Sequence, residues 1–507
     1  MKRFLNKMKD PQERKYFCTM LGAKLLGAMA VFAVYYTVKA MLHGSNVWAD
    51  DATTAPAAAA ASAAVPAATA AAAATPAYVN PINTVWVLVT AFLVFFMQAG
   101  FMMLEGGFAR SRETVNVMLE GIIDTCLCGL LFYGWGFAWM FGAGNGFIGN
   151  QYYFLHNIPD TYGTTGVPTL AIFLFQFAFA DCTSTITSGA MVGRTGFIGD
   201  LLYSVVVSGL IYPLLGHWAW GPDGWLNNIH PAAFHDFAGS TVVHTIGGMI
   251  ALAGAVVLGP RLGRKFKRDG GGPMPGHDMT IAALGTIILW FGWYGFNPGS
   301  TLSAMDTLGI ARIATNTTLA AVTGGIVAMF VVYPRSKIWD CGTTCNGLLA
   351  GLVAITCPCY WVSPFGAICL GGIAGVVVVL ATDLLEYLRI DDPVGAWPVH
   401  GAAGVWGTLS LGLFATGQYG APTPTGADNS AGSVVTGLFY GGGLTQLKAQ
   451  MIGSACIGGS ALILGFILMY AVHYMTGTLR ISKEGELQGM DIHEHGGAAY
   501  PEFTTGA

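Results

Sequence analysis

Two histidines lie inside long apolar stretches of this sequence. His244 occurs in VVHTIGG and His400 in PVHGAAG, and each is followed by a glycine four residues later. A charge at the middle of a bilayer costs about 2.5 to 3.5 kcal/mol, so such a residue normally faces a partner or a cavity. Two neighbouring imidazoles can share one proton along an N–H···N bond, and they would repel each other if both were charged. A pair of this kind can pass protons or small neutral polar molecules.

Other uses of the two histidines remain open at this stage. Each one alone is as well explained as a neutral core residue bonded to a backbone carbonyl. Paired membrane histidines also ligate haem, but nothing else in the chain indicates a haem, and His493 and His495 are too sparse to predict a metal site. We therefore expect no cofactor and no metal.

Aromatic side chains with small polar neighbours gather near the ends of three apolar stretches. They are Phe175, Gln176 and Phe179 in LFQFAFA, Trp293, Phe296 and Ser300 in WFGWYGFNPGS, and Trp220 in GHWAWGPDGW. Phe175 and Phe179 are four residues apart and so share one helical face. Tryptophan at a membrane interface is usually an anchor. Ring faces beside a hydroxyl, without a ring of acids, would also hold a small cation.

An acidic residue precedes the first histidine by eight positions. Asp236 lies in HDFAGSTVVH. It is placed to cap the following helix, because an aspartate side chain accepts hydrogen bonds from the first free amides. It could equally attract a cation, and the two roles are compatible.

The composition is that of a membrane protein. Of 507 residues, 53% are hydrophobic and 10% charged, with 23 Lys and Arg against 27 Asp and Glu. Soluble domains carry about a quarter charged residues. The slightly acidic balance, with no basic surface, excludes nucleic-acid binding. The ten cysteines form no disulfide framework.

Apolar runs of membrane-spanning length recur along the chain and predict an all-α integral membrane protein. Their approximate centres are residues 93, 131, 177, 207, 250, 287, 323, 352, 373, 407 and 463. The cations that follow the odd-numbered runs all fall on one side: Arg110, Arg112, Arg194, Arg261, Arg264, Lys265, Lys267, Arg268, Arg335, Lys337, Arg389, Arg480 and Lys483. Only Arg312 and Lys448 fall on the other. This asymmetry predicts an outside N-terminus and a cytoplasmic C-terminus.

An odd number of spans is explained by two sets of five and one extra. Five spans repeated by the next five would be inverted in the membrane, as in many transporters. The Val-His match between the fifth and tenth runs supports this symmetry, because these two runs are the expected partners. The repeat would bring His244 and His400 together near the middle of the membrane.

The N-terminal region divides into two predicted parts. Residues 1–49 carry basic residues, a short apolar core and VWA at the end, which is typical of a signal peptide; a retained anchor is the alternative. Residues 50–80 are rich in Ala and Pro and indicate an extracytoplasmic linker. The transmembrane domain is then 81–476 and the cytoplasmic tail 477–507.

Several separate motifs resemble one family, from about residue 83 to 503. They are FFMQAGFMMLEGGFARSRETVNV, FQFAFA with TSGAMVGRT, DFAGSTVVH, FGWYGFNPGS, CNGLLAGLVAIT, DDPVGAWPVHGAAGVWG and LRISKEGELQGMDIHEHGGAAYPEF. The chain resembles the family of ammonium transporters, methylammonium permeases and Rhesus proteins, and within it the bacterial ammonium transporter branch.

The resemblance implies a homotrimer in the cell (inner) membrane, with one pore in each eleven-helix protomer. By motif position it assigns an outer ammonium site to Trp220, Phe179 and Ser300, to which we add Phe175, and a gate to Phe179 and Phe296. It assigns the pore to His244, His400 and Trp293, with Asp236 in support. We also predict Tyr212 in the pore and Gln176 in a supporting role. The tail resembles the segment at which the family meets PII signalling proteins.

The sequence departs from the family pattern at two positions. Asp181 stands where a small apolar residue is common, and Gly193 replaces the acid of the GAMAER-like motif. Asp181 lies about 200° from Phe179 around the helix, so we expect it to face away from the lumen as a hydrogen-bonded acid at a helix or subunit contact.

The interpretation is an ammonium transporter or channel that deprotonates ammonium and passes ammonia. The alternatives are an ammonium sensor that signals through a partner, or a Rhesus-like gas channel. An enzyme is disfavoured, because no nucleophile and base at a recognisable spacing lie outside the apolar runs.

Overall fold

A computed structural model describes residues 76–430, 433–477 and 479–501. The predicted signal peptide and most of the predicted linker therefore lie outside the described residues. The helices are α3 Val79–Phe95, α4 Met97–Phe108, α5 Thr114–Leu131, η1 Phe132–Gly136, α6 Phe137–Phe141, η2 Tyr153–Leu155, α7 Thr169–Gly189, α8 Phe197–Val206, η3 Val207–Ile211, α9 Tyr212–Trp220, η4 Trp225–Asn228, η5 Ser240–Thr245, α10 Ile246–Leu258, η6 Lys267–Asp269, α11 Met279–Gly299, α12 Thr307–Ser336, α13 Cys341–Thr356, α14 Pro364–Leu388, η7 Trp397–Ala402, α15 Ala403–Phe414, η8 Leu438–Tyr440, α16 Thr445–Thr476, α17 Lys483–Gln488 and α18 Met490–His495.

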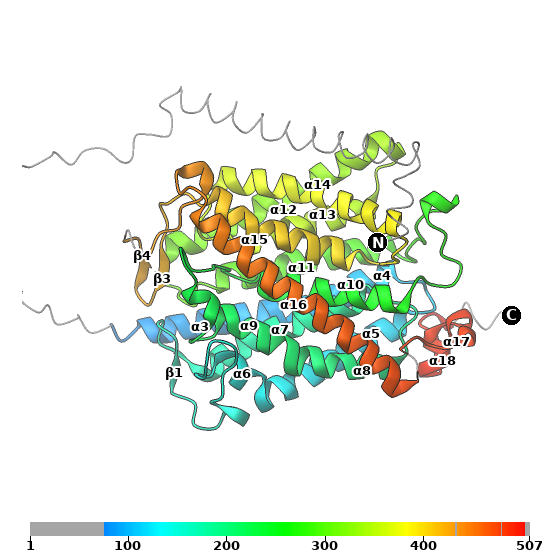
Figure 1. Ribbon diagram of the computed structural model, residues 1–507, viewed down its shortest axis with the longest axis horizontal. Helices are drawn as coiled ribbons and strands as arrows, with labels where there is room; N and C mark the ends of the chain where they lie inside the picture. The colour runs from blue at the N-terminus through cyan, green and yellow to red at the C-terminus, as the bar shows by residue number, and fades with distance from the viewer. Residues whose placement is uncertain (1–75, 431–432, 478, 502–507) are drawn as a thin grey trace, which may run out of the picture. The chain divides into compact units, whose positions relative to one another are not determined.

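Long apolar helices make up most of the described chain (Figure 1). Within the described residues, nine helices are long and apolar enough to cross a membrane. One shorter apolar helix, α13, accompanies them, and the consecutive helices η7 and α15 cover Trp397–Phe414. Each predicted centre falls in one of these segments, and the all-α membrane class is confirmed.

Two small β-hairpins were not predicted. Strand β1 (Thr161–Tyr162) pairs antiparallel with β2 (Val167–Pro168), and β3 (Ala421–Thr423) pairs with β4 (Gly426–Asp428). Both lie in loops between apolar helices. Strands of two or three residues are too short to produce a recognisable alternation of polar and apolar residues.

Polar side chains mark where several helices begin. Backbone amides of the first turn donate to Asp278 at α11, Asp306 at α12, Asp340 at α13, Ser363 at α14 and Ser482 at α17. The first amides of a helix have no partner within it, so these side chains satisfy them.

The ends of the long helices form two groups, which we call the hairpin end and the tail end. Strands β1, β3 and β4 lie at the hairpin end, and α17 and α18 lie at the tail end (Figure 1). Bonds from loop arginines to carbonyls at helix ends hold the tail end together. The guanidinium of Arg112 donates to the Leu487 carbonyl at 2.7 Å, and that of Arg480 donates to the Leu258 carbonyl at 3.0 Å.

A buried ionic cluster at the tail end centres on Asp391. Its carboxylate accepts from Arg261 Nε at 2.8 Å and Nη2 at 3.0 Å, and from Arg264 Nε at 3.3 Å. Arg194 donates to the Asp391 carbonyl at 2.6 Å. Burial lowers the pKa of Arg194 to about 10, so its guanidinium stays charged at neutral pH.

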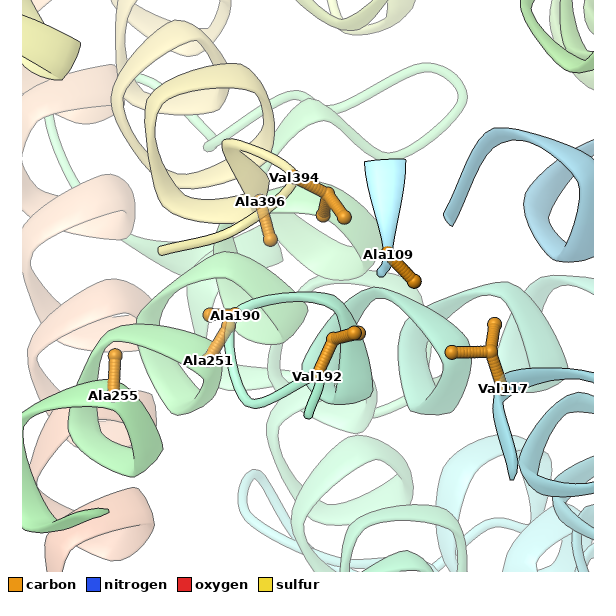
Figure 2. Close-up of a cluster of buried hydrophobic side chains, with 8 residues drawn as sticks. All are labelled: Ala109, Val117, Ala190, Val192, Ala251, Ala255, Val394 and Ala396. Carbon is orange, nitrogen blue, oxygen red and sulfur yellow. The ribbon is translucent and has the colours of Figure 1, made fainter. Parts of the chain in front are cut away.

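Small apolar side chains pack beside this cluster. Figure 2 shows Ala190 and Ala251 facing each other, with Val192, Val394 and Ala396 close by, all of them buried. Small side chains allow membrane helices and loops to approach closely. The packing fixes the loop before η7. This loop contains Asp391 and leads into the segment that bears His400.

Candidate functional site

The two histidines lie side by side in the interior of the helical body. His244 belongs to η5 and His400 to η7, which are both short π-helical segments at the start of longer helices. The two Nδ1 atoms are 3.1 Å apart, within hydrogen-bond distance. Both side chains are buried, with 0% and 5% exposure. This direct contact favours the imidazole pair over haem ligation.

The glycine four residues after each histidine allows this approach. A Cβ atom added at Gly248 would clash with the backbone nitrogen of Gly401, and one added at Gly404 would lie 2.6 Å from the Ser240 carbonyl oxygen. The start of α10 therefore touches η7 at Gly248, and the start of α15 touches η5 at Gly404. The pattern that the two apolar runs share in sequence marks the contact between them.

A column of rings continues from the histidines toward the hairpin end. His244 stacks on Trp293 and Phe296, with ring centroids 5.2 and 5.4 Å apart. Phe296 stacks on Phe179 at 4.0 Å, and Phe179 contacts Trp220 at 6.1 Å. The first four rings are buried, whereas Trp220 is half-buried. The phenyl pair thus separates the imidazoles from the more open end of the column.

Polar atoms at the ends of the column have specific partners. Trp293 Nε1 donates to Thr356 Oγ1 at 2.9 Å, and Ser300 Oγ donates to the Phe296 carbonyl at 2.8 Å. Trp220 Nε1 donates to the Asp236 carbonyl at 2.8 Å. The Ser300 hydroxyl is half-buried, so its oxygen can still accept a bond from a guest.

Asp236 holds the beginning of η5. Its carboxylate accepts from the amides of Gly239, Ser240, Thr241 and Val242 at 2.8 to 3.0 Å. Burial raises the pKa of this carboxyl, and the four amide bonds oppose that rise. The capping role predicted for Asp236 is confirmed.

Sequence reasoning missed Asp392, which caps the beginning of η7 as Asp236 caps that of η5. The Asp392 carboxylate accepts from the amides of Gly395, Ala396 and Trp397 at 2.9 to 3.0 Å. Like Asp236 before His244, Asp392 stands eight residues before His400. The equal spacing was the available signal.

We expect Asp392→Ala to destabilise the protein as Asp236→Ala does. Each substitution leaves buried amides without an acceptor, which costs about 1 to 3 kcal/mol. Thermal unfolding in detergent would measure both, with Asp428→Ala in the exposed hairpin β3–β4 as the control. If Asp236→Ala lowered the unfolding temperature and Asp392→Ala did not, the two aspartates would not have equivalent structural roles.

Not all of the predicted site residues contact the rings of the column. The Phe175 ring packs on Phe179, with centroids 4.7 Å apart. Gln176 and Tyr212 are buried, and among the described residues the Gln176 Oε1 and the Tyr212 hydroxyl have no hydrogen-bond partner. Neither residue has a described ring contact with the histidines. Their assignments to the site and the pore remain predictions.

The two departures from the family pattern have structural explanations. Asp181 accepts a hydrogen bond from Thr125 of α5 at 3.0 Å, so it is a bonded acid at a helix contact, as expected. At Gly193 an added Cβ would lie 2.6 Å from the carboxylate of Glu113. Glu113 pairs with Arg110, which also donates to the Gly193 carbonyl at 3.3 Å. The carboxylate of Glu113, at the start of α5, therefore lies next to Gly193, the position at which the family pattern has an acid.

A small cavity lies on the other side of the histidine pair, toward the tail end. His400, Phe101, Glu105, Asn346 and Val394 are among the residues that line it. Sequence reasoning missed Glu105, because a single acid near the end of an apolar run is more often a cap or a surface residue. Its burial, with 5% exposure, became visible only in the structure.

The fold and the site together define a multi-pass membrane protein with a buried imidazole pair. The model of the Ammonium Transporter Family matches residues 85–500. The chain belongs to this family, whose members are transporters and not enzymes.

Named relatives and solved structures agree with this membership. Ammonium transporter Amt2 of Archaeoglobus fulgidus is 44% identical over 435 residues, which cover 83% of this chain and 89% of the relative. Ammonium transporter 1 member 1 of Arabidopsis thaliana is 40% identical over 422 residues, or 79% and 82% of the two chains. A solved structure described as a Sensor Amt Protein has a TM-score of 0.73 and 35% identity, and covers 82% of this chain and 99% of its own. Saccharomyces cerevisiae Mep2 has a TM-score of 0.71 and 26% identity, with coverage of 79% and 90%.

Proposed function

We propose that this chain recruits ammonium between Trp220, Phe179 and Ser300, removes a proton and passes ammonia along the ring column. The observation that carries the proposal is the direct contact of His244 and His400 behind the stacked Phe179–Phe296 pair. The aromatic faces and the Ser300 hydroxyl suit a small cation, and the buried imidazoles suit a neutral guest.

Deprotonation explains how such a path distinguishes ammonium from potassium. Moving a bare ion into an apolar interior costs about 20 kcal/mol in the idealised Born estimate. Ring contacts worth about 2 kcal/mol each cannot offset that cost. Ammonium can release a proton and potassium cannot, so the requirement for a neutral guest is itself the selectivity step.

The released proton has two possible routes. It either returns to the outside, which makes the protein a neutral gas channel, or it crosses separately along the histidines. Current measured on solid-supported membranes after an ammonium jump distinguishes the two routes. Absence of charge transfer in an active preparation would eliminate the second.

Uptake of labelled methylammonium tests the proposed function. We expect cells that lack their own transporters to accumulate the label when they express this chain, and a large excess of potassium to leave the rate unchanged. Ammonium should compete fully. Competition by potassium would contradict passage of a neutral guest.

The proposal extends to topology and assembly. Eleven spans would form a 5+5 inverted repeat and one extra helix, with the N-terminus outside and the C-terminus cytoplasmic. The matched placement of His244 with Asp236 and of His400 with Asp392 supports the repeat, and the arginines of the tail end support the orientation. Residues 1–49 would be a signal peptide. We further propose a homotrimer in the inner membrane and a PII protein as the partner of the tail.

A sensor is the second candidate function. The likeness to a solved structure described as a Sensor Amt Protein favours it. Ammonium binding without methylammonium flux would support the sensor and exclude the channel.

A further inference from the structure

Glu105 offers a free carboxyl oxygen beside the imidazole pair, on the tail-end side. Its Oε2 accepts a hydrogen bond from Ser188 Oγ at 3.3 Å, and among the described residues Oε1 has no hydrogen-bond partner. No described cation forms an ion pair with it. A carboxyl that is buried without a cation costs least when it holds its proton.

The cavity places this carboxyl on the path of a molecule that leaves the histidines. His400 and Glu105 line the same cavity. The Phe101 ring is 6.2 Å from the His400 ring, and Glu105 follows Phe101 by one helical turn on the same face of α4. That turn advances about 5.4 Å toward the tail end.

A second polar atom borders the cavity. The side-chain nitrogen of Asn346 donates to the Val394 carbonyl at 3.0 Å, while its Oδ1 has no hydrogen-bond partner in the described part of the chain. The remaining surface is largely apolar. A guest with several N–H donors would satisfy both free oxygens, whereas an apolar guest would leave them unpaired.

We propose that Glu105 and Asn346 form an inner ammonium site, where Glu105 gives its proton to ammonia that arrives past His400. The O–H bond of the carboxyl breaks and an N–H bond forms, so ammonia and a carboxylic acid become ammonium and a carboxylate, with no change of charge. The pair is held together by its opposite charges and by Asn346 Oδ1. When ammonium leaves, the carboxylate takes a proton from the solution at the tail end.

The groups around Glu105 fit this role. Besides His400 in the same cavity, the acids Asp200 and Asp392 act on it through their charge. Reprotonation of the carboxylate from the tail end prepares the site for the next molecule.

The inference rests on the proposed function and is tested by infrared difference spectra of the full chain in lipid, with ammonium chloride exchanged for potassium chloride. The wild type should lose intensity in the band of the protonated carboxyl group and gain it in the carboxylate band. Glu105→Gln should lack this change and should slow methylammonium uptake about a hundredfold, the lower end of the range for loss of a general acid.

Two further variants complete the test. Glu105→Asp keeps a carboxyl and should restore the spectral change. Glu120→Gln is the matched control, because Glu120 is also buried in the helical body but is bonded by Asn116 at 2.7 Å and lies outside the cavity lining. It should keep the full change.

The outcomes separate the two proposals. A wild type that takes up methylammonium without any carboxyl change overturns the inner site alone. The inner site is also overturned if Glu105→Gln shows the same spectral change as the wild type. A wild type that takes up no methylammonium overturns the proposed function.

Discussion

Potassium rejection is expected to fail in His244→Asp. The aspartate places an acceptor that can carry a negative charge in the buried column, so a cation no longer has to lose its proton to be stabilised there. We expect potassium to compete with methylammonium uptake at least about tenfold more effectively, which corresponds to about 1.4 kcal/mol. Flux of labelled potassium into proteoliposomes measures the change directly.

His473→Asp is the matched control for this substitution. His473 lies on α16 and is half-buried, and its Nδ1 accepts from the Leu479 amide at 3.3 Å, outside the ring column. It introduces the same side chain without altering the path, so potassium rejection should persist. Unchanged rejection in His244→Asp, with ammonium transport intact, would show that the imidazole pair does not provide selectivity.

Asp391→Asn is expected to cause the largest loss of stability. The substitution removes the charge that compensates Arg261 and Arg264 in a cluster where Asp391 is only 2% exposed. Removal of one partner of a buried ion pair typically costs about 3–5 kcal/mol, and we expect a loss of about this size in the free energy of unfolding. Thermal unfolding in detergent, followed by intrinsic fluorescence, measures the loss.

Asp383→Asn is the appropriate comparison. Asp383 pairs with Arg335 at 2.6 Å, but the Arg335 side chain is 49% exposed. Exposed ion pairs contribute about 0 to 1 kcal/mol, so this variant should unfold near the wild-type temperature. An equal loss for both variants would indicate that burial does not determine the contribution of Asp391.

The pH dependence of stability has a definite sign for the same carboxyl. Burial raises the pKa of Asp391, but the hydrogen bonds from Arg261 and the charges of Arg194 and Arg261 outweigh it and hold the pKa well below its ordinary value. The resulting stabilisation is fully present above the ordinary aspartate pKa of about 3.9 and is lost as the pH falls through the folded-state pKa. The unfolding temperature of Asp391→Asn should therefore depend less on pH below about 4 than that of the wild type.

Much of the fold could be predicted because it depends on local pattern. Apolar runs long enough to span a bilayer fix the helices, since a backbone in lipid must satisfy its own hydrogen bonds. The two small hairpins were missed, because their strands are too short to carry a period. Asp392 was missed although the sequence held its signal, the repeated spacing of eight residues to a histidine.

The sequence by itself determined that this chain has two histidines inside apolar runs, aromatic groups near the ends of such runs and motifs of a family that transports ammonium. Only the tertiary structure decided which atoms meet. The contact between His244 and His400 joins residues 156 positions apart. It depends on how closely α10 approaches η7 at Gly248 and α15 approaches η5 at Gly404, and on the loop that Asp391 holds. The place of Glu105 was decided in the same way, because burial beside a cavity is a property of several helices together and is absent from the pattern of any one of them.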